Sequence, residues 1–141
     1  MIHFLDTSAL IKRYVMEPGS EHVRRLLRRN VDVALARITE AEAYAAVARA
    51  VRMNVLTGED RDRVLEQIAI DVAAARVVEI RRVVVSAVRE IVARWPLRGY
   101  DAVQLSCALR LQSEGLAVTF WCADEALASA ARGEGMRVMV V

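Results

Sequence analysis

The sequence IHFLDTSALIKRY, residues 2–14, joins a short apolar run directly to a stretch with helical spacing. The apolar run at 2–5 predicts a buried strand, and the residues after it predict a helix over 7–14. Asp6 lies at the junction between the two. A strand that passes into a helix through an acidic residue is typical of α/β folds, in which ligands gather at the carboxyl ends of the strands.

The same alternation continues along the chain. Further strands are expected at 31–36, 117–122 and 137–141, and 77–80 is either a short strand or a connection. Helices are expected from Ser20 and at 39–52, 57–75, 82–95, 101–112 and 125–132. The sequence therefore predicts one α/β domain over residues 1–141, with a parallel sheet of four to five strands covered by helices.

Composition narrows the class of protein. The 141 residues are 55% hydrophobic and 27% charged, with mean hydropathy +0.25, which favours one globular core over disorder. No apolar run approaches the roughly 20 residues that cross a bilayer, and the N-terminus has no signal-peptide core. We expect a cytoplasmic protein with no membrane association. Cys107 and Cys122 have no partnering motif, so we expect both to be core residues.

The charge balance says little about partners. Twenty basic residues against 18 acidic ones give a net charge of +2. Lys12 is the only lysine, so 19 of the basic residues are arginines, which can bind phosphate bidentately. Codon bias is the simpler explanation of this skew, and arginine richness therefore only permits an RNA-binding interpretation.

Four acidic residues occupy corresponding places in the expected elements. Asp6 and Asp124 come where a strand gives way to a helix, and Glu42 and Asp101 lie in the first turns of expected helices. If the sheet brings them together, they form a pocket of like charges that needs protons or a cation. Oxygen ligands alone favour Mg²⁺ or Mn²⁺ over zinc.

Each acid also has an ordinary explanation. Asp6, Asp101 and Asp124 could be N-caps of helices. Thr39 and Glu42 match a capping box, in which the glutamate reaches back to the helix start. Caps have no reason to converge, however, and the first expected strand and the strand at 117–122 are both followed by aspartate.

Together, four segments resemble the PIN domain family, and specifically its VapC-type toxin nucleases of prokaryotic toxin–antitoxin systems. They are LDTSALIKRY, TEAEAYAAVAR, LRGYDAVQLSCAL and FWCADEALASAARGEGMRV, and the resemblance runs from Ile2 to Val140. It implies a three-layer α/β/α fold around a central parallel sheet. It also implies a Mg²⁺-dependent endoribonuclease that hydrolyses RNA phosphodiesters by metal-activated water, with Mn²⁺ as a substitute.

The resemblance assigns roles to particular residues. The metal ligands and catalytic acids would be Asp6, Glu42, Asp101 and Asp124. A hydroxyl of Thr7 or Ser8 would assist by orienting water. Glu40 is a rival to Glu42, which is preferred because EAYAAVAR follows the family pattern after the acid.

Three positions depart from the family pattern. Gln104 stands where a histidine is frequent, and Trp121 and Cys122 replace smaller or hydroxyl-bearing residues. These departures spare the four acids, so they bear on substrate preference and local geometry more than on activity.

The resemblance further implies partners. A small antitoxin would cover the catalytic groove with its C-terminal segment and bind operator DNA with its N-terminal part, so DNA would be contacted only through the antitoxin. A homodimer is also implied, and the apolar stretch 77–95 is compatible with it. The alternatives are a non-catalytic PIN-like binding or scaffold protein and a receiver-like phosphoacceptor domain. The receiver-like domain is disfavoured because such domains need a lysine after a late strand, and the only lysine, Lys12, lies near the start of the chain.

Overall fold

The computed structural model describes residues 1–141 and is built on a five-stranded sheet with the order β3-β2-β1-β4-β5. Every pair of neighbouring strands is parallel. The strands are β1 (Ile2–Leu5), β2 (Asp32–Ala36), β3 (Arg76–Val78), β4 (Val118–Cys122) and β5 (Arg137–Val140). The parallel sheet confirms the expected fold class. The segment near 77–80 is resolved as a strand, because Leu35 of β2 pairs with Val77.

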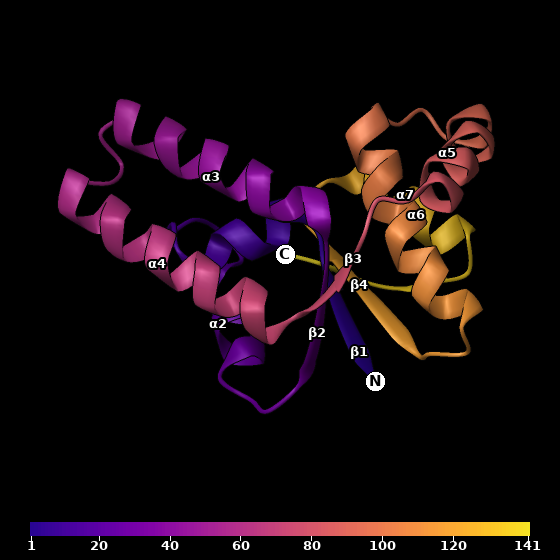
Figure 1. The fold of residues 1–141 in the computed structure, drawn as a ribbon, viewed down its shortest axis with the longest axis horizontal. Coiled ribbons are helices and arrows are strands. Elements are labelled where there is room, and N and C mark those ends of the chain that lie inside the picture. The colour runs from indigo at the N-terminus through magenta and orange to yellow at the C-terminus, as the bar shows by residue number, and fades with distance from the viewer.

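Helices cover both faces of this sheet in three layers (Figure 1). The helices α1 to α4 lie on one face, and α5 to α7 lie on the other. Their bounds are α1 (Thr7–Leu10), α2 (Ser20–Leu27), α3 (Arg37–Arg52), α4 (Gly58–Ala74), α5 (Arg82–Arg94), α6 (Gly99–Ser113) and α7 (Glu125–Gly133). None of them has both the length and the hydrophobicity needed to cross a lipid bilayer.

Each face of the sheet has its own hydrophobic core, because successive strand residues point to opposite sides. Phe4 stacks on Phe120 with ring centroids 5.5 Å apart, in the core shared with α5 to α7. Leu5 and Trp121, one residue further along the same strands, pack in the core shared with α1 to α4. Both cysteines are buried and free, as expected for core residues.

Two expected helix starts are corrected by the structure. Helix α3 begins at Arg37 instead of residue 39, and Ala36 at the end of β2 is its N-cap. The capping-box interpretation is therefore wrong: Thr39 lies inside the first turn with its side chain buried, and Glu42 belongs to the second turn. Helix α6 begins at Gly99 with Arg98 as its N-cap, so Asp101 caps no helix.

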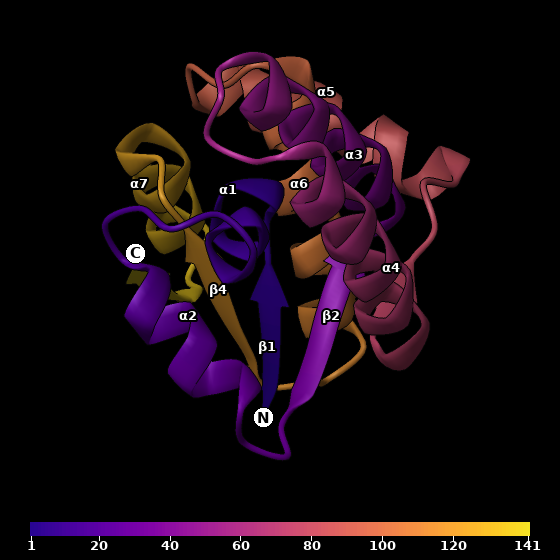
Figure 2. The same ribbon diagram turned by 90° about the vertical axis from the view of Figure 1, so that its left-hand side faces the viewer.

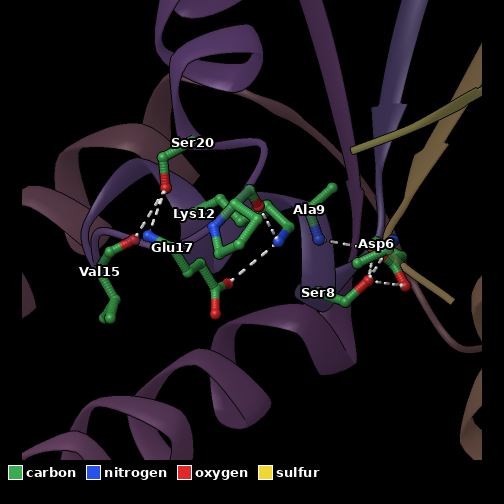
Figure 3. Close-up of polar contacts among 9 residues, drawn as sticks. Asp6, Ser8, Ala9, Lys12, Val15, Glu17 and Ser20 are labelled. Carbon is green, nitrogen blue, oxygen red and sulfur yellow. Dashed lines mark hydrogen bonds and ion pairs between the residues drawn. The ribbon is translucent and has the colours of Figure 1, made fainter.

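The first helix is shorter than expected. Helix α1 ends at Leu10 and continues as a 3₁₀ turn, η1 (Ile11–Arg13), before the turn at Pro18 and Gly19. That turn is anchored by the only lysine: Lys12 Nζ donates to the Pro18 carbonyl at 2.6 Å and lies 3.4 Å from Glu17 Oε1 (Figure 3). The anchored turn holds the chain in place directly after α1.

Strand order determines where a ligand site can form. The chain leaves β1 toward β2 on one side, whereas β4 lies on the other side of β1, with α1 at the tip of β1 (Figure 2). The carboxyl ends of β1 and β4 therefore flank a topological switch point, which is the usual ligand position in open parallel sheets. Asp6 follows β1, and Asp124 lies two residues after β4.

Candidate functional site

Asp6 is a helix cap and a buried acid at the same time. Its Oδ1 accepts a hydrogen bond from the Ala9 amide at 2.9 Å, and Ser8 Oγ lies 2.7 and 2.9 Å from its two oxygens (Figure 3). The residue is only 4% exposed and has no cationic partner. Burial raises the pKa of Asp6 to about 7, and the charges of Asp101 and Glu42 add to that rise, while the bonds from Ser8 and Ala9 oppose it.

Asp101 and Asp124 extend the group of carboxylates. Burial, and next the charge of Asp124, raise the pKa of Asp101, which Glu42 raises further and Arg98 lowers. Asp124 caps α7 through a bond of 2.7 Å from the Leu127 amide to Oδ1. The structure thus places the four acids at one edge of the sheet, where Glu42 raises the pKa of both Asp6 and Asp101, and Asp124 raises that of Asp101.

Side chains from two other helices hold the Glu42 carboxylate in place. Its Oε2 accepts hydrogen bonds from Thr7 Oγ1 of α1 and, at 2.9 Å, from Gln104 Nε2 of α6. Gln104 Nε2 also lies 3.0 Å from the hydroxyls of both Thr7 and Thr39. Since Gln104 is 2% exposed and Thr39 is fully buried, this network lies beneath the acids.

Glu40 is held away from the other acids. Its Oε2 lies 3.1 Å from Arg37 Nη1, and its Oε1 accepts a 2.8 Å hydrogen bond from the Tyr44 hydroxyl. Among the charges that raise the pKa of Asp6 and Asp101 are those of Glu42 but not of Glu40. Of the two glutamates, Glu42 is the one that belongs to the acid group.

The donor set suits a hard divalent cation. It consists of carboxylate and hydroxyl oxygens, and a buried, unpaired acid stands beside two further acids. No group of three or more Asp, Glu, His or Cys side chains has the geometry to hold an ion by itself. Mg²⁺ keeps several waters and needs only one or two protein carboxylates, so the residues present fit Mg²⁺ or Mn²⁺ with water completing the coordination.

Sequence reasoning gave no role at this site to three residues, although it noted Gln104 as a departure from the family pattern. Gln104 and Thr39 support Glu42, and Arg98 lies close enough to Asp101 to lower its pKa. The available signal for Gln104 was a polar residue, one helical turn after Asp101, on a helix face otherwise formed by apolar residues. Thr39 gave no such signal, because its position also matched a cap.

A model of the PIN domain family matches residues 3–132, and the chain therefore belongs to that family. Over 139 residues it is 34% identical to Ribonuclease VapC45 of Mycobacterium tuberculosis strain CDC 1551 / Oshkosh and to Ribonuclease VapC49 of strain ATCC 25618 / H37Rv. Each match covers 96% of this chain and 92% of the relative. The resemblance to VapC-type proteins is thereby confirmed.

Solved structures share the fold. FitAB bound to an IR36 DNA fragment gives a TM-score of 0.71 at 21% identity, covering 99% of this chain and 94% of that one. VapBC2 from Rickettsia felis, bound to a promoter DNA fragment, gives a TM-score of 0.67 at 14% identity, and the match covers 100% of this chain and 99% of that one. VapC20 of Mycobacterium tuberculosis, described as a sarcin-ricin loop cleaving toxin, gives a TM-score of 0.66 at 15% identity. That match covers 91% of this chain and 94% of the other. These similarities confirm the three-layer α/β/α architecture.

The receiver-like alternative is wrong. Receiver domains have the strand order 2-1-3-4-5. This sheet has the order β3-β2-β1-β4-β5, and the chain belongs to a different family.

Proposed function

We propose that this protein is a metal-dependent endoribonuclease toxin of the VapC type. The observation that carries the proposal is Asp6, a buried acid with no cationic partner, grouped with Glu42 and Asp101 at the switch point of the sheet. Relatives that are 34% identical and named ribonucleases support RNA as the substrate.

The acids divide the catalytic work. Asp6, Asp101 and Asp124, with Glu42 nearby and with water completing the coordination, would hold Mg²⁺ or Mn²⁺, which when bound supplies positive charge at the scissile phosphate and acidifies the attacking water. Glu42 Oε1 has no hydrogen-bond partner in the protein, whereas Oε2 is held by Thr7 and Gln104. Glu42 therefore orients the attacking water and accepts its proton through Oε1.

The two hydroxyls next to Asp6 have structural partners. Thr7 donates to Glu42, and Ser8 contacts Asp6 while accepting a 2.8 Å bond from the Ala123 amide. Thr7 and Ser8 would therefore assist the reaction by fixing the carboxylates, and Ser8 also ties α1 to the end of β4.

RNA would approach past the start of α6. Arg98 lies near Asp101, is exposed and makes no ion pair, which suits a phosphate contact. Tyr100 is 65% exposed and can stack on an unpaired base. Both residues adjoin Asp101 in the sequence, so they place substrate contacts beside the acids.

A small antitoxin is the partner that the comparisons support best. Similar structures include FitAB and VapBC2 assemblies bound to DNA. We expect this chain to contact operator DNA only through such an antitoxin, to act on RNA in the cytoplasm and to form a homodimer.

Cleavage assays with a purified sample test the proposal. RNA should be cleaved in Mg²⁺, left intact in EDTA and cleaved again when Mn²⁺ is added in excess. Cleavage that resists EDTA would contradict the metal-dependent reaction. RNA binding without turnover in either metal would instead support the non-catalytic scaffold alternative.

A further inference from the structure

Gln104 is a polar residue on the buried face of α6. Its helix neighbours Ala102, Leu105 and Ala108 belong to the core against the sheet, and Gln104 itself is 2% exposed. A buried amide requires hydrogen-bond partners, and those of Gln104 all come from α1 and α3. The amide therefore joins three helices at the site.

The positions of the acceptor oxygens limit how the hydrogen atoms of this network are shared. The Gln104 amide has two hydrogens but lies within 3.0 Å of three oxygens, those of Glu42, Thr7 and Thr39. The Thr39 hydroxyl can donate to Gln104 Oε1 at 3.3 Å. Glu42 Oε2 and Thr7 Oγ1 are hydrogen-bonded to each other and lie in nearly the same direction from the amide nitrogen, so they share one amide hydrogen, and the second hydrogen is left for Thr39 Oγ1.

The two oxygens of the Glu42 carboxylate have different surroundings. Oε2 receives two hydrogen bonds, and Oε1 receives none from the protein. We propose that Gln104 and Thr39 are positioning residues, which lock the Glu42 carboxylate so that Oε1 alone remains available beside Asp6 and Asp101. The inference rests on the proposed ribonuclease function and adds the residues that set its geometry.

A neutral amide suits this task better than a cation. A lysine or arginine at this place would hold Glu42 equally well, but its charge would oppose a divalent cation at the neighbouring acids. Gln104 donates hydrogen bonds without adding charge, and the Thr39 hydroxyl contacts both ends of the amide and holds it in place. The network therefore adds no positive charge to the acid group.

Four variants test the pair. Gln104→Met keeps the length and removes both polar atoms, and Thr39→Val keeps the shape and removes the hydroxyl. Thr39→Ser retains the hydroxyl and is the rescue variant. Thr119→Val is the matched control, because Thr119 is a 3% exposed threonine of β4 whose hydroxyl contacts only Met1 Sδ at 3.3 Å.

Each variant is tested by three measurements: its Mn²⁺ affinity by calorimetry, its kcat and KM for RNA, and its melting temperature without metal. Gln104→Met and Thr39→Val should weaken Mn²⁺ binding and lower kcat by about 10- to 100-fold, with KM for RNA unchanged. Thr39→Ser should recover most of the loss, and Thr119→Val should match the wild type in both affinity and kcat. Thr39→Val decides the matter if Gln104→Met fails to fold.

Wild-type Mn²⁺ affinity and kcat in folded Gln104→Met or Thr39→Val would overturn the inference, even if the melting temperature fell, because the amide would then serve only packing. Failure of the ribonuclease proposal is a separate result: the wild type would bind Mn²⁺ and cleave no RNA. In that case the affinities alone still decide whether Gln104 and Thr39 position Glu42.

Discussion

At the scale of single residues, Asp6 combines two roles that the sequence offers as alternatives. Its Oδ1 caps α1 at the Ala9 amide, and its buried charge is unpaired within the acid group. One carboxylate can do both because the cap places it at the end of β1, where the ligand site of a parallel sheet forms. The N-cap explanation therefore does not compete with the metal-ligand proposal.

The raised pKa of Asp6, about 7, predicts a pH-dependent stability of the metal-free protein. Between about pH 4 and 7 the folded protein retains a proton that the unfolded chain has released, so stability falls as pH rises, by at most about 1.4 kcal/mol per pH unit. Asp6→Asn should flatten this dependence. Urea unfolding in EDTA at pH 5, 6 and 7 measures it, and equal slopes for both proteins would contradict the prediction.

Glu42 and Glu40 make a matched pair for mutation. Glu42→Gln should lower RNA cleavage by about 100-fold or more, since the proposed proton acceptor is lost. Glu40→Gln should leave the rate nearly unchanged, because Glu40 contacts Arg37 and Tyr44 instead of the other acids. Single-turnover cleavage rates compare them, and the reverse order of effects would show that Glu40 is the functional glutamate.

The four acids could be predicted as one group from the sequence because each follows a strand or lies near a helix start, and the family pattern favoured Glu42 over Glu40. Gln104 could not be recognised as a site residue in this way. Its partners lie 65 and 97 residues away at Thr39 and Thr7, and only the fold brings these residues of α6, α3 and α1 together.

At the scale of elements, tertiary contacts decided what local patterns left open. The strand β3 is short, and its pairing with β2 distinguishes it from a connection. The start of α3 was misplaced because Thr39 and Glu42 fit a capping box, while the chain actually enters the helix directly from β2 at Ala36. Helix and strand types were otherwise predicted correctly, because their apolar spacing is regular.

The end of α7 packs tightly against the end of α5. A Cβ atom at Gly133 would lie 2.1 Å from Cη2 of the Trp95 ring. Gly133→Ala should therefore lower the free energy of unfolding by about 1–3 kcal/mol through overpacking. Gly58→Ala is the control at another helical glycine, where a Cβ would meet nothing within 4 Å.

Denaturant unfolding measures both alanine variants. Gly58→Ala should be neutral or stabilising by up to about 1 kcal/mol. Equal unfolding free energies for the two variants would show that the Trp95 contact does not restrict position 133.

At the scale of the whole molecule, the strand order gathers charge that the sequence distributes widely. Asp6 and Asp124 are 118 positions apart in the chain, yet they follow neighbouring strands. The net charge of +2 hides this arrangement, because it sums an acidic site and arginines elsewhere on the surface. The distribution of charge over the molecule, and not the net charge, suits a metal site that RNA approaches.

Arg98 should contribute to RNA binding as a phosphate contact. Arg98→Ala should weaken binding and lower the slope of log affinity against log salt concentration by about 0.7, the value for one contact to a single strand. Arg110→Ala, within the helix that Arg98 precedes, is the control because Arg110 is already paired with Glu114 at 3.0 Å. Affinities at several salt concentrations, with EDTA to prevent cleavage, compare the two, and equal slopes would contradict the assignment.

The central claim is that the acid group performs metal-dependent RNA cleavage. The most direct test compares single-turnover cleavage in Mg²⁺ by the wild type, Asp101→Asn and Asp62→Asn, an exposed aspartate paired only with Arg61. The account predicts that Asp101→Asn, still folded, loses about 100-fold or more while Asp62→Asn cleaves like the wild type. Wild-type cleavage by folded Asp101→Asn would contradict it.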